Sequence, residues 1–174
     1  FILCFEFFGD FMEDYRKIPA ELMDHRKLAR TLSMVEDRSP GYLSLMKQCY
    51  RTSGGARIIG ITGPPGAGKS TLTSALIRKY RADGKRVGVL AVDPSSSFSG
   101  GAILGDRIRM MEMSLDDGVF IRSAATRGSM GGLSAAAGDM ITVMDAAGFD
   151  IILVETVGVG QDEVEIVGTA DVSL

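Results

Sequence analysis

The spacing of apolar residues along this chain of 174 residues changes near residue 57. Before that point apolar positions recur at helical intervals, and charged residues fill the positions between them. On this basis residues 19–37 are predicted to form an amphipathic helix with an apolar stripe of Leu28, Leu32 and Val35. We expect the stripe to pack against the rest of the protein, although such a stripe also suits a partner-binding face.

A second helix is predicted to begin at Ser39-Pro40, because serine is a favoured N-cap and proline fits the first helical position. Its expected apolar stripe consists of Leu43, Met46 and Tyr50. Residues 51–55 have the composition of a linker. The predicted division is therefore a helical N-terminal extension over residues 1–52 and an α/β domain over residues 53–174.

After residue 57, short apolar runs alternate with helical stretches. Buried strands are predicted at residues 58–61, 86–92, 119–122 and 151–154, and residues 170–174 look like the start of another. Helices are predicted at residues 69–82, 105–115 and 133–147. This alternation predicts an α/β fold with a doubly wound, mostly parallel sheet, in which ligands bind at the carboxyl ends of the strands.

Composition narrows the class of protein. Hydrophobic residues make up 45% of the chain and charged residues 24%, which argues against a disordered chain or a coiled coil. The net charge is −3, so no basic excess points to nucleic acid or an anionic membrane as a partner. No apolar run approaches the ~20 residues that span a bilayer.

Soft metal ligands are few, since Cys4, Cys49 and His25 are scattered and no C-x-x-C spacing occurs. A zinc or nickel site and a disulfide framework are therefore not expected. This cysteine usage predicts a reducing compartment, and the cytoplasm is the expected location.

Both ends of the sequence suggest a piece of a longer protein. Residues 1–11 are unusually aromatic and precede Met12, so they are interpreted as upstream translated sequence or as a cut within a longer chain. A compact domain rarely stops at a strand that is just beginning, as residues 170–174 are predicted to be.

Residues 63–71 (GPPGAGKST) carry the strongest chemical signal. They match G-x-x-x-x-G-K-[ST] between a predicted strand and a predicted helix, which is the context that a phosphate-binding loop requires. Glycines let successive N–H groups turn toward phosphate oxygens, and the helix adds the positive end of its dipole. The predicted nucleotide-binding residues of this loop are Gly63, Pro64, Pro65, Gly66, Ala67, Gly68, Lys69, Ser70 and Thr71.

Lys69 is predicted to reach the β- and γ-phosphates, and the Ser70 hydroxyl to hold Mg²⁺. Asp93 and Glu155 each end a predicted strand, and Asp106 stands at the start of a predicted helix. Mg²⁺ prefers hard oxygen ligands, so these three acids are predicted to contact the metal directly or through water. A turn-forming role for Asp93 and an N-cap role for Asp106 are the alternatives.

Two further loops hold candidates. The N–H of Gly158 suits a γ-phosphate contact that is released after hydrolysis, which would make its loop a switch. Gln161 is a candidate for orienting the attacking water, so the predicted catalytic residues are Lys69, Glu155 and Gln161. Arg127 is a candidate for stabilising transition-state charge, although a pair with a surface carboxylate is the more common role for such an arginine.

Four segments together resemble the MeaB/ArgK family of P-loop GTPases, across about residues 28–172. They are GPPGAGKST (63–71), VDPSSSFSGGAILGDRIRM (92–110), ATRGSMGGLS (125–134) and ETVGVGQDEVE (155–165). The resemblance implies a P-loop NTPase G domain with a helical N-terminal extension, and a homodimer for the full-length protein. It implies that GTP hydrolysis to GDP, with Mg²⁺ as cofactor, assists or protects a cobalamin-dependent acyl-CoA mutase, typically methylmalonyl-CoA mutase. On this pattern Asp93, Asp106 and Glu155 match the family's acidic Mg²⁺-site residues.

Other functions remain open at this point. GTP is not distinguished from ATP by these residues, because a guanine-reading N-K-x-D element is expected only after the next strand. An older label for the family is an arginine/ornithine transport-system ATPase or kinase. A metal-insertion GTPase would need a Cys/His-rich segment, and a small-molecule kinase would need an acceptor pocket with a base near the γ-phosphate. Nucleotide binding without turnover is a further alternative.

Overall fold

The computed structural model of the chain describes residues 22, 24–93, 113–125, 132–156 and 168–174. The described helices are α3 (His25–Glu36), α4 (Tyr42–Thr52), α5 (Lys69–Ala82), α7 (Gly132–Ala146) and the short 3-10 helix η2 (Met113–Leu115). The described strands are β1 (Arg57–Ile61), β2 (Val87–Asp93), β3 (Val119–Ala125), β4 (Ile151–Thr156) and β5 (Val172–Ser173). All five predicted strands are confirmed, and so are the helices predicted over α5 and α7.

The strands form one parallel sheet in the order β3-β2-β4-β1-β5. β1 and β4 are direct neighbours, and Ile61 lies opposite Glu155 in their register. Parallel strands end at the same edge of a sheet, so the loop after β1 and the acid at the end of β4 meet there. The predicted α/β class with a mostly parallel sheet is confirmed.

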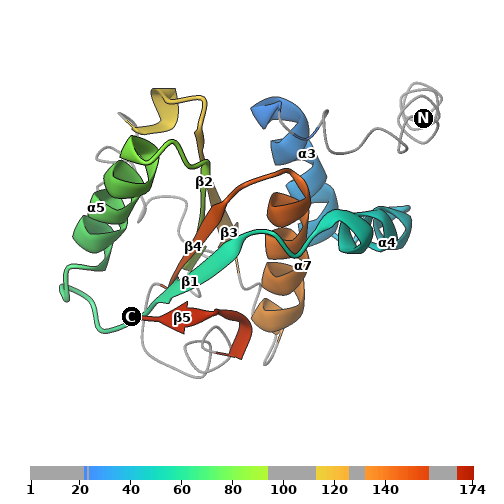
Figure 1. The fold of residues 1–174 in the computed structure, drawn as a ribbon. Coiled ribbons are helices and arrows are strands. Elements are labelled where there is room, and N and C mark those ends of the chain that lie inside the picture. Colours follow the sequence, from blue (N-terminus) through green and yellow to red (C-terminus); the bar gives the residue numbers. More distant parts are fainter. Residues whose placement is uncertain (1–21, 23, 94–112, 126–131, 157–167) are drawn as a thin grey trace.

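Helices cover both faces of the sheet (Figure 1). α5 packs on one face over β2 and β4, and α7 packs on the other, with α3 and α4 lying against α7. Side chains alternate along each strand, so β4 presents Ile151 and Leu153 to the α5 face and Ile152 and Val154 to the α7 face. We refer to these two sides of the sheet as the α5 face and the α7 face.

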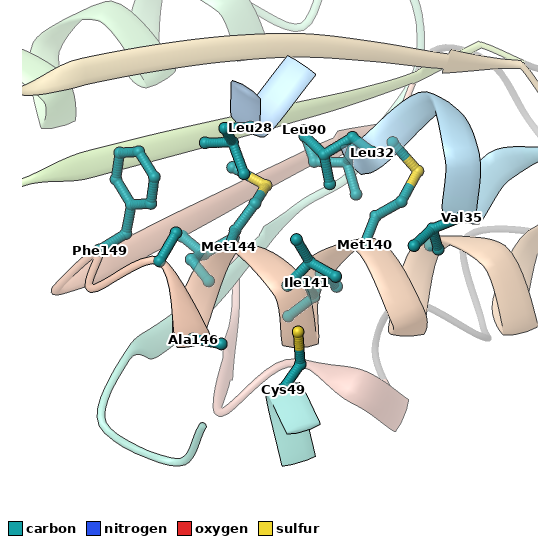
Figure 2. Packing of buried hydrophobic residues seen from close by; sticks show 14 of the residues in the cluster. Leu28, Leu32, Val35, Cys49, Leu90, Met140, Ile141, Met144, Ala146 and Phe149 are labelled. Atoms are coloured by element: carbon teal, nitrogen blue, oxygen red, sulfur yellow. The ribbon is translucent and has the colours of Figure 1, made fainter. Parts of the chain in front are cut away.

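The α7 face carries the larger apolar cluster (Figure 2). The predicted stripe of the first helix, Leu28, Leu32 and Val35, is buried there to 1% exposure or less, against Met140 and Met144 of α7. This confirms that the stripe packs against the rest of the chain. Burial of this kind is the main source of stability for helices as short as α3.

The linker between α4 and β1 is fastened to the last turn of α7. The carboxylate of Asp145 accepts hydrogen bonds from three successive backbone N–H groups, those of Gly54, Gly55 and Ala56, the last at 2.9 Å. The segment before the sheet is therefore held by a residue about ninety positions later in the chain.

α3 begins at His25, later than the predicted residue 19. Asp24 is its N-cap, and the Asp24 carboxylate accepts hydrogen bonds from the N–H groups of Arg26 and Lys27 at 2.7 and 3.1 Å. These two backbone hydrogen bonds, that of Lys27 first, lower the pKa of Asp24 below its ordinary value.

The predicted start of the second helix at Ser39-Pro40 is wrong, because α4 begins at Tyr42 with Gly41 as its N-cap. Ser39 instead caps the end of α3, because its backbone N–H donates to the carbonyl oxygen of Met34 at 2.9 Å. The chain then turns into α4 through Gly41, whose φ of +92° favours glycine.

The predicted apolar stripe of α4 is also largely wrong. Leu43 and Tyr50 are each 62% exposed, and the buried residues of α4 are Leu45, Met46 and Cys49. Of the predicted stripe only Met46 faces α7. Burial raises the pKa of the Cys49 thiol to about 11.

The helix predicted over residues 105–115 falls mostly outside the described residues, and its last part is the 3-10 helix η2. In the part of the chain that the structure describes, no helix has the length and apolar character needed to cross a membrane.

Candidate nucleotide-binding site

The loop between β1 and α5 has the backbone that its sequence predicts. Gly66 and Gly68 both lie in the left-handed region, at φ +82° and +89°. A Cβ atom added to either would meet nothing within 4 Å, so glycine is needed for its backbone conformation and not for space. Gly68 is the N-cap of α5 and offers no side-chain cap, which leaves this helix end suited to an anion.

Lys69 is the first residue of α5, and its side chain folds back over the loop. Its Nζ donates to the carbonyl oxygens of Gly63 and Pro64, at 2.6 and 3.0 Å. The ammonium group is thereby held above the loop at the carboxyl end of β1. Of the other loop residues, 64–68 and Thr71 are exposed.

The acid at the end of β4 lies beside this loop. The Glu155 side chain is only 4% exposed, and its Oε1 accepts a hydrogen bond from Ser70 Oγ at 2.8 Å. Its Oε2 accepts one from Thr73 Oγ1, also at 2.8 Å. The structure thus brings together the predicted residues Ser70 and Glu155 and adds Thr73, which the sequence analysis did not identify.

The alternation of side chains along β4 explains why the Glu155 carboxylate points toward α5. Ile151, Leu153 and Glu155 occupy the same side of the strand, and the first two pack in the apolar cluster of the α5 face with Ile77. Glu155 continues this side beyond the apolar cluster and meets the first turn of α5. A hydrogen bond from Thr156 Oγ1 to Thr62 Oγ1, at 3.3 Å, joins the ends of β4 and β1 at the same level.

Several predicted site residues are not placed by the structure. Asp93 ends β2, next to β4 in the sheet, but its side chain is not described. The other predicted residues outside the described part of the chain are Asp106, Arg127, Gly158 and Gln161.

The donor atoms at this edge fit Mg²⁺. A hydroxyl oxygen and a carboxylate oxygen, those of Ser70 in the first turn of α5 and Glu155 at the carboxyl end of β4, lie 2.8 Å apart. Mg²⁺ takes hard oxygen ligands and normally uses only one or two carboxylates. No group of three or more His, Cys, Asp or Glu residues suited to a metal occurs among the described residues, so they contain no candidate for an all-protein metal cage.

A family model described as "Methylmalonyl Co-A mutase-associated GTPase MeaB" matches residues 28–174. The chain belongs to the MeaB family. The match includes most of α3, all of α4, the phosphate loop and the five described strands. The family resemblance stated from the sequence is confirmed.

Relatives of this MeaB-family chain carry related names. A protein of Pyrococcus horikoshii named as a GTPase is 58% identical over 148 residues, which are 85% of this chain and 47% of the relative. GTPase ArgK of Escherichia coli is 40% identical over 148 residues, 83% of this chain and 45% of the relative. A mouse protein named "Methylmalonic aciduria type A homolog, mitochondrial" is 46% identical over 113 residues, 65% of this chain and 27% of the relative.

A solved structure agrees with the fold. The crystal structure of a protein named LAO/AO transport system kinase has a TM-score of 0.70 and 31% identity, and it covers 94% of this chain and 49% of that protein. The chain spans about half the length of the bacterial and archaeal relatives that it matches.

Proposed function

We propose that this chain is the nucleotide-binding part of a Mg²⁺-dependent GTPase that assists a cobalamin-dependent acyl-CoA mutase. The observation that carries the nucleotide site is the 2.8 Å contact between Ser70 of the phosphate loop and Glu155 of the neighbouring strand. P-loop NTPases hold Mg²⁺ between a loop hydroxyl and an acid at the end of an adjacent strand.

In this proposal the loop binds the phosphates and Lys69 holds their charge. Lys69 Nζ exchanges the carbonyl oxygens of Gly63 and Pro64 for phosphate oxygens, because a hydrogen bond between two charged groups is the stronger one. Ser70 and Glu155 hold Mg²⁺, which neutralises charge on the phosphate oxygens when bound. Positioning and charge stabilisation then do most of the work of hydrolysis.

Residues whose side chains the structure does not describe complete the proposed site. Asp93 and Asp106 contact Mg²⁺ directly or through water, as Mg²⁺ sites with several waters allow. The N–H of Gly158 contacts the γ-phosphate, and Gln161 orients the attacking water.

The choice of guanine and of the mutase rests on the family, since the family description names a methylmalonyl-CoA mutase-associated GTPase. We expect inorganic phosphate release from GTP to become faster when purified methylmalonyl-CoA mutase is added. Phosphate release assays with and without the mutase measure this effect. An unchanged rate would contradict the mutase role and leave nucleotide hydrolysis standing.

Substitution of Lys69 tests the nucleotide site itself. We expect Lys69→Ala to weaken binding of a non-hydrolysable GTP analogue by about 100-fold or more, since a charged hydrogen bond to phosphate is lost. Lys79→Ala is the matched control, because Lys79 is on the same helix and forms an exposed ion pair with Asp83, at 2.9 Å. Titration calorimetry measures both affinities. Equal affinity in Lys69→Ala and the unsubstituted chain would overturn the proposed site.

A further inference from the structure

We infer that Thr73 is a positioning residue that orients the Glu155 carboxylate for magnesium–nucleotide binding; this inference rests on the proposed function. Thr73 lies one turn after Lys69 on α5 and is 0% exposed. Its Oγ1 donates to Glu155 Oε2 at 2.8 Å, while Ser70 Oγ donates to Oε1 at the same distance. Each oxygen of the carboxylate therefore has its own hydroxyl partner.

The Thr73 proton has two acceptors within reach. Thr73 Oγ1 also lies 3.0 Å from the carbonyl oxygen of Lys69, one turn earlier in the helix. A hydroxyl donates one proton, and a carboxylate is a stronger acceptor than a neutral carbonyl. The Lys69 carbonyl also has the backbone N–H of Thr73 as its ordinary helical partner. The proton is therefore directed to Glu155.

Water does not substitute for this hydroxyl. Glu155 is 4% exposed and Thr73 is fully buried, so loss of the hydroxyl leaves a carboxylate oxygen without its partner. The carboxylate then gains by turning toward the remaining donor, Ser70, or toward solvent. Either movement changes the arrangement of Ser70 Oγ and Glu155 Oε1 that the proposed metal site uses.

Thr73 acts through Glu155 and is not itself a ligand in this arrangement. Its hydroxyl donates to Glu155 Oε2, whereas the Ser70 hydroxyl donates to Oε1. Residues that orient a metal ligand in this way change metal affinity by about 10- to 100-fold when they are removed. The property that Thr73 should control is therefore the dependence of nucleotide binding on magnesium.

The experiment measures the affinity of the chain for a non-hydrolysable GTP analogue across a series of Mg²⁺ concentrations and in EDTA. We expect Thr73→Val, which keeps the shape and lacks the hydroxyl, to raise the half-saturating Mg²⁺ concentration by about tenfold or more. Its affinity in EDTA should change far less. Thr73→Ser restores the hydroxyl and should return the Mg²⁺ dependence to near that of the unsubstituted chain.

Thr142→Val is a matched control. Thr142 of α7 makes the same type of bond to the carbonyl one turn earlier, that of Gly138 at 2.9 Å, and it lies on the other face of the sheet. Its substitution should leave the Mg²⁺ dependence unchanged. If Thr73→Val does not fold, Thr73→Ser and Thr73→Ala give the same comparison, since both lack the methyl group and differ in the hydroxyl.

The inference is overturned if the variants without the hydroxyl keep the original Mg²⁺ dependence. It is also overturned if they lose as much affinity in EDTA as in Mg²⁺, because Thr73 would then have a structural role only. Absence of nucleotide binding by the unsubstituted chain is a different result. It would overturn the proposed function, and the role of Thr73 with it.

Discussion

The two faces of the sheet are built from alternate residues of the same strands, yet they end differently. On the α7 face, β4 presents Ile152 and Val154 and ends at the neutral hydroxyl of Thr156, and the helices above the face add leucines and methionines. On the α5 face, Ile151 and Leu153 are followed by Glu155, which meets the hydroxyl groups of α5. One side of β4 therefore ends at a neutral hydroxyl, and the other ends at a buried carboxylate held by the hydroxyl groups of α5.

This difference separates stability from binding. Apolar burial supplies most of the favourable free energy of folding, whereas a buried carboxylate needs hydrogen bonds to offset its desolvation. The α7 face is suited to hold the fold, and the α5 face holds both a smaller apolar cluster and the candidate site. Substitutions on the two faces should therefore have different consequences.

The largest expected effect is on the α7 face. Ile152 is 0% exposed within its cluster, so Ile152→Ala should lower the free energy of unfolding by about 3 kcal/mol through lost burial and a cavity. Urea unfolding measures this loss. The folded fraction should bind the GTP analogue with unchanged affinity, and a weaker affinity of that fraction would break the separation between the faces.

A smaller effect concerns the acid sensitivity of the α5 face. Arg81 of α5 donates to both carboxylate oxygens of Asp116, each at 2.8 Å, and the N–H of Gly118 donates to the same carboxylate. The pKa of Asp116 lies below its ordinary value of 3.8, chiefly because of the hydrogen bond from Arg81 and secondly because of the hydrogen bond from the Gly118 N–H. The resulting stability is present above pH 3.8 and is lost as the pH falls through the lower pKa of the folded state.

Asp116→Asn tests this pair. The free energy of unfolding of Asp116→Asn should fall less on acidification than that of the unsubstituted protein. The difference between the two decreases should stay under about 1 kcal/mol, because both side chains of the pair are partly exposed. Urea unfolding of both proteins across the acid range measures the difference. Parallel stability curves for the two proteins would show that the pair contributes nothing.

The elements of the fold differed in how well the sequence predicted them. The sheet strands and α5 were predicted closely, because buried parallel strands and a phosphate loop have strong local patterns. The stripe of α4 was not, because Leu43, Leu45, Met46, Cys49 and Tyr50 lie on more than one side of an 11-residue helix. Helical periodicity alone does not decide which side meets α7, since that depends on the direction in which α4 leaves α3.

The sequence predicted the phosphate loop and the acid Glu155 of the candidate site, but not the hydrogen bond between Thr73 and Glu155. Ser70 and Glu155 each belong to a recognisable pattern, and the order of the strands brings them together. Thr73 has no such pattern, because a threonine inside a helix usually bonds to the carbonyl of the preceding turn, which for Thr73 is that of Lys69 at 3.0 Å. Its second contact depends on how α5 crosses β4, which is a property of the tertiary structure.

The fastening of the linker by Asp145 bears on the order in which this protein is completed during synthesis. α3 and α4 leave the ribosome before α7, but their buried side chains and the N–H groups of residues 54–56 have partners on α7. Helices of 12 and 11 residues are only marginally stable alone in water. These two helices therefore remain without this packing partner until α7, which ends at Ala146, has been translated.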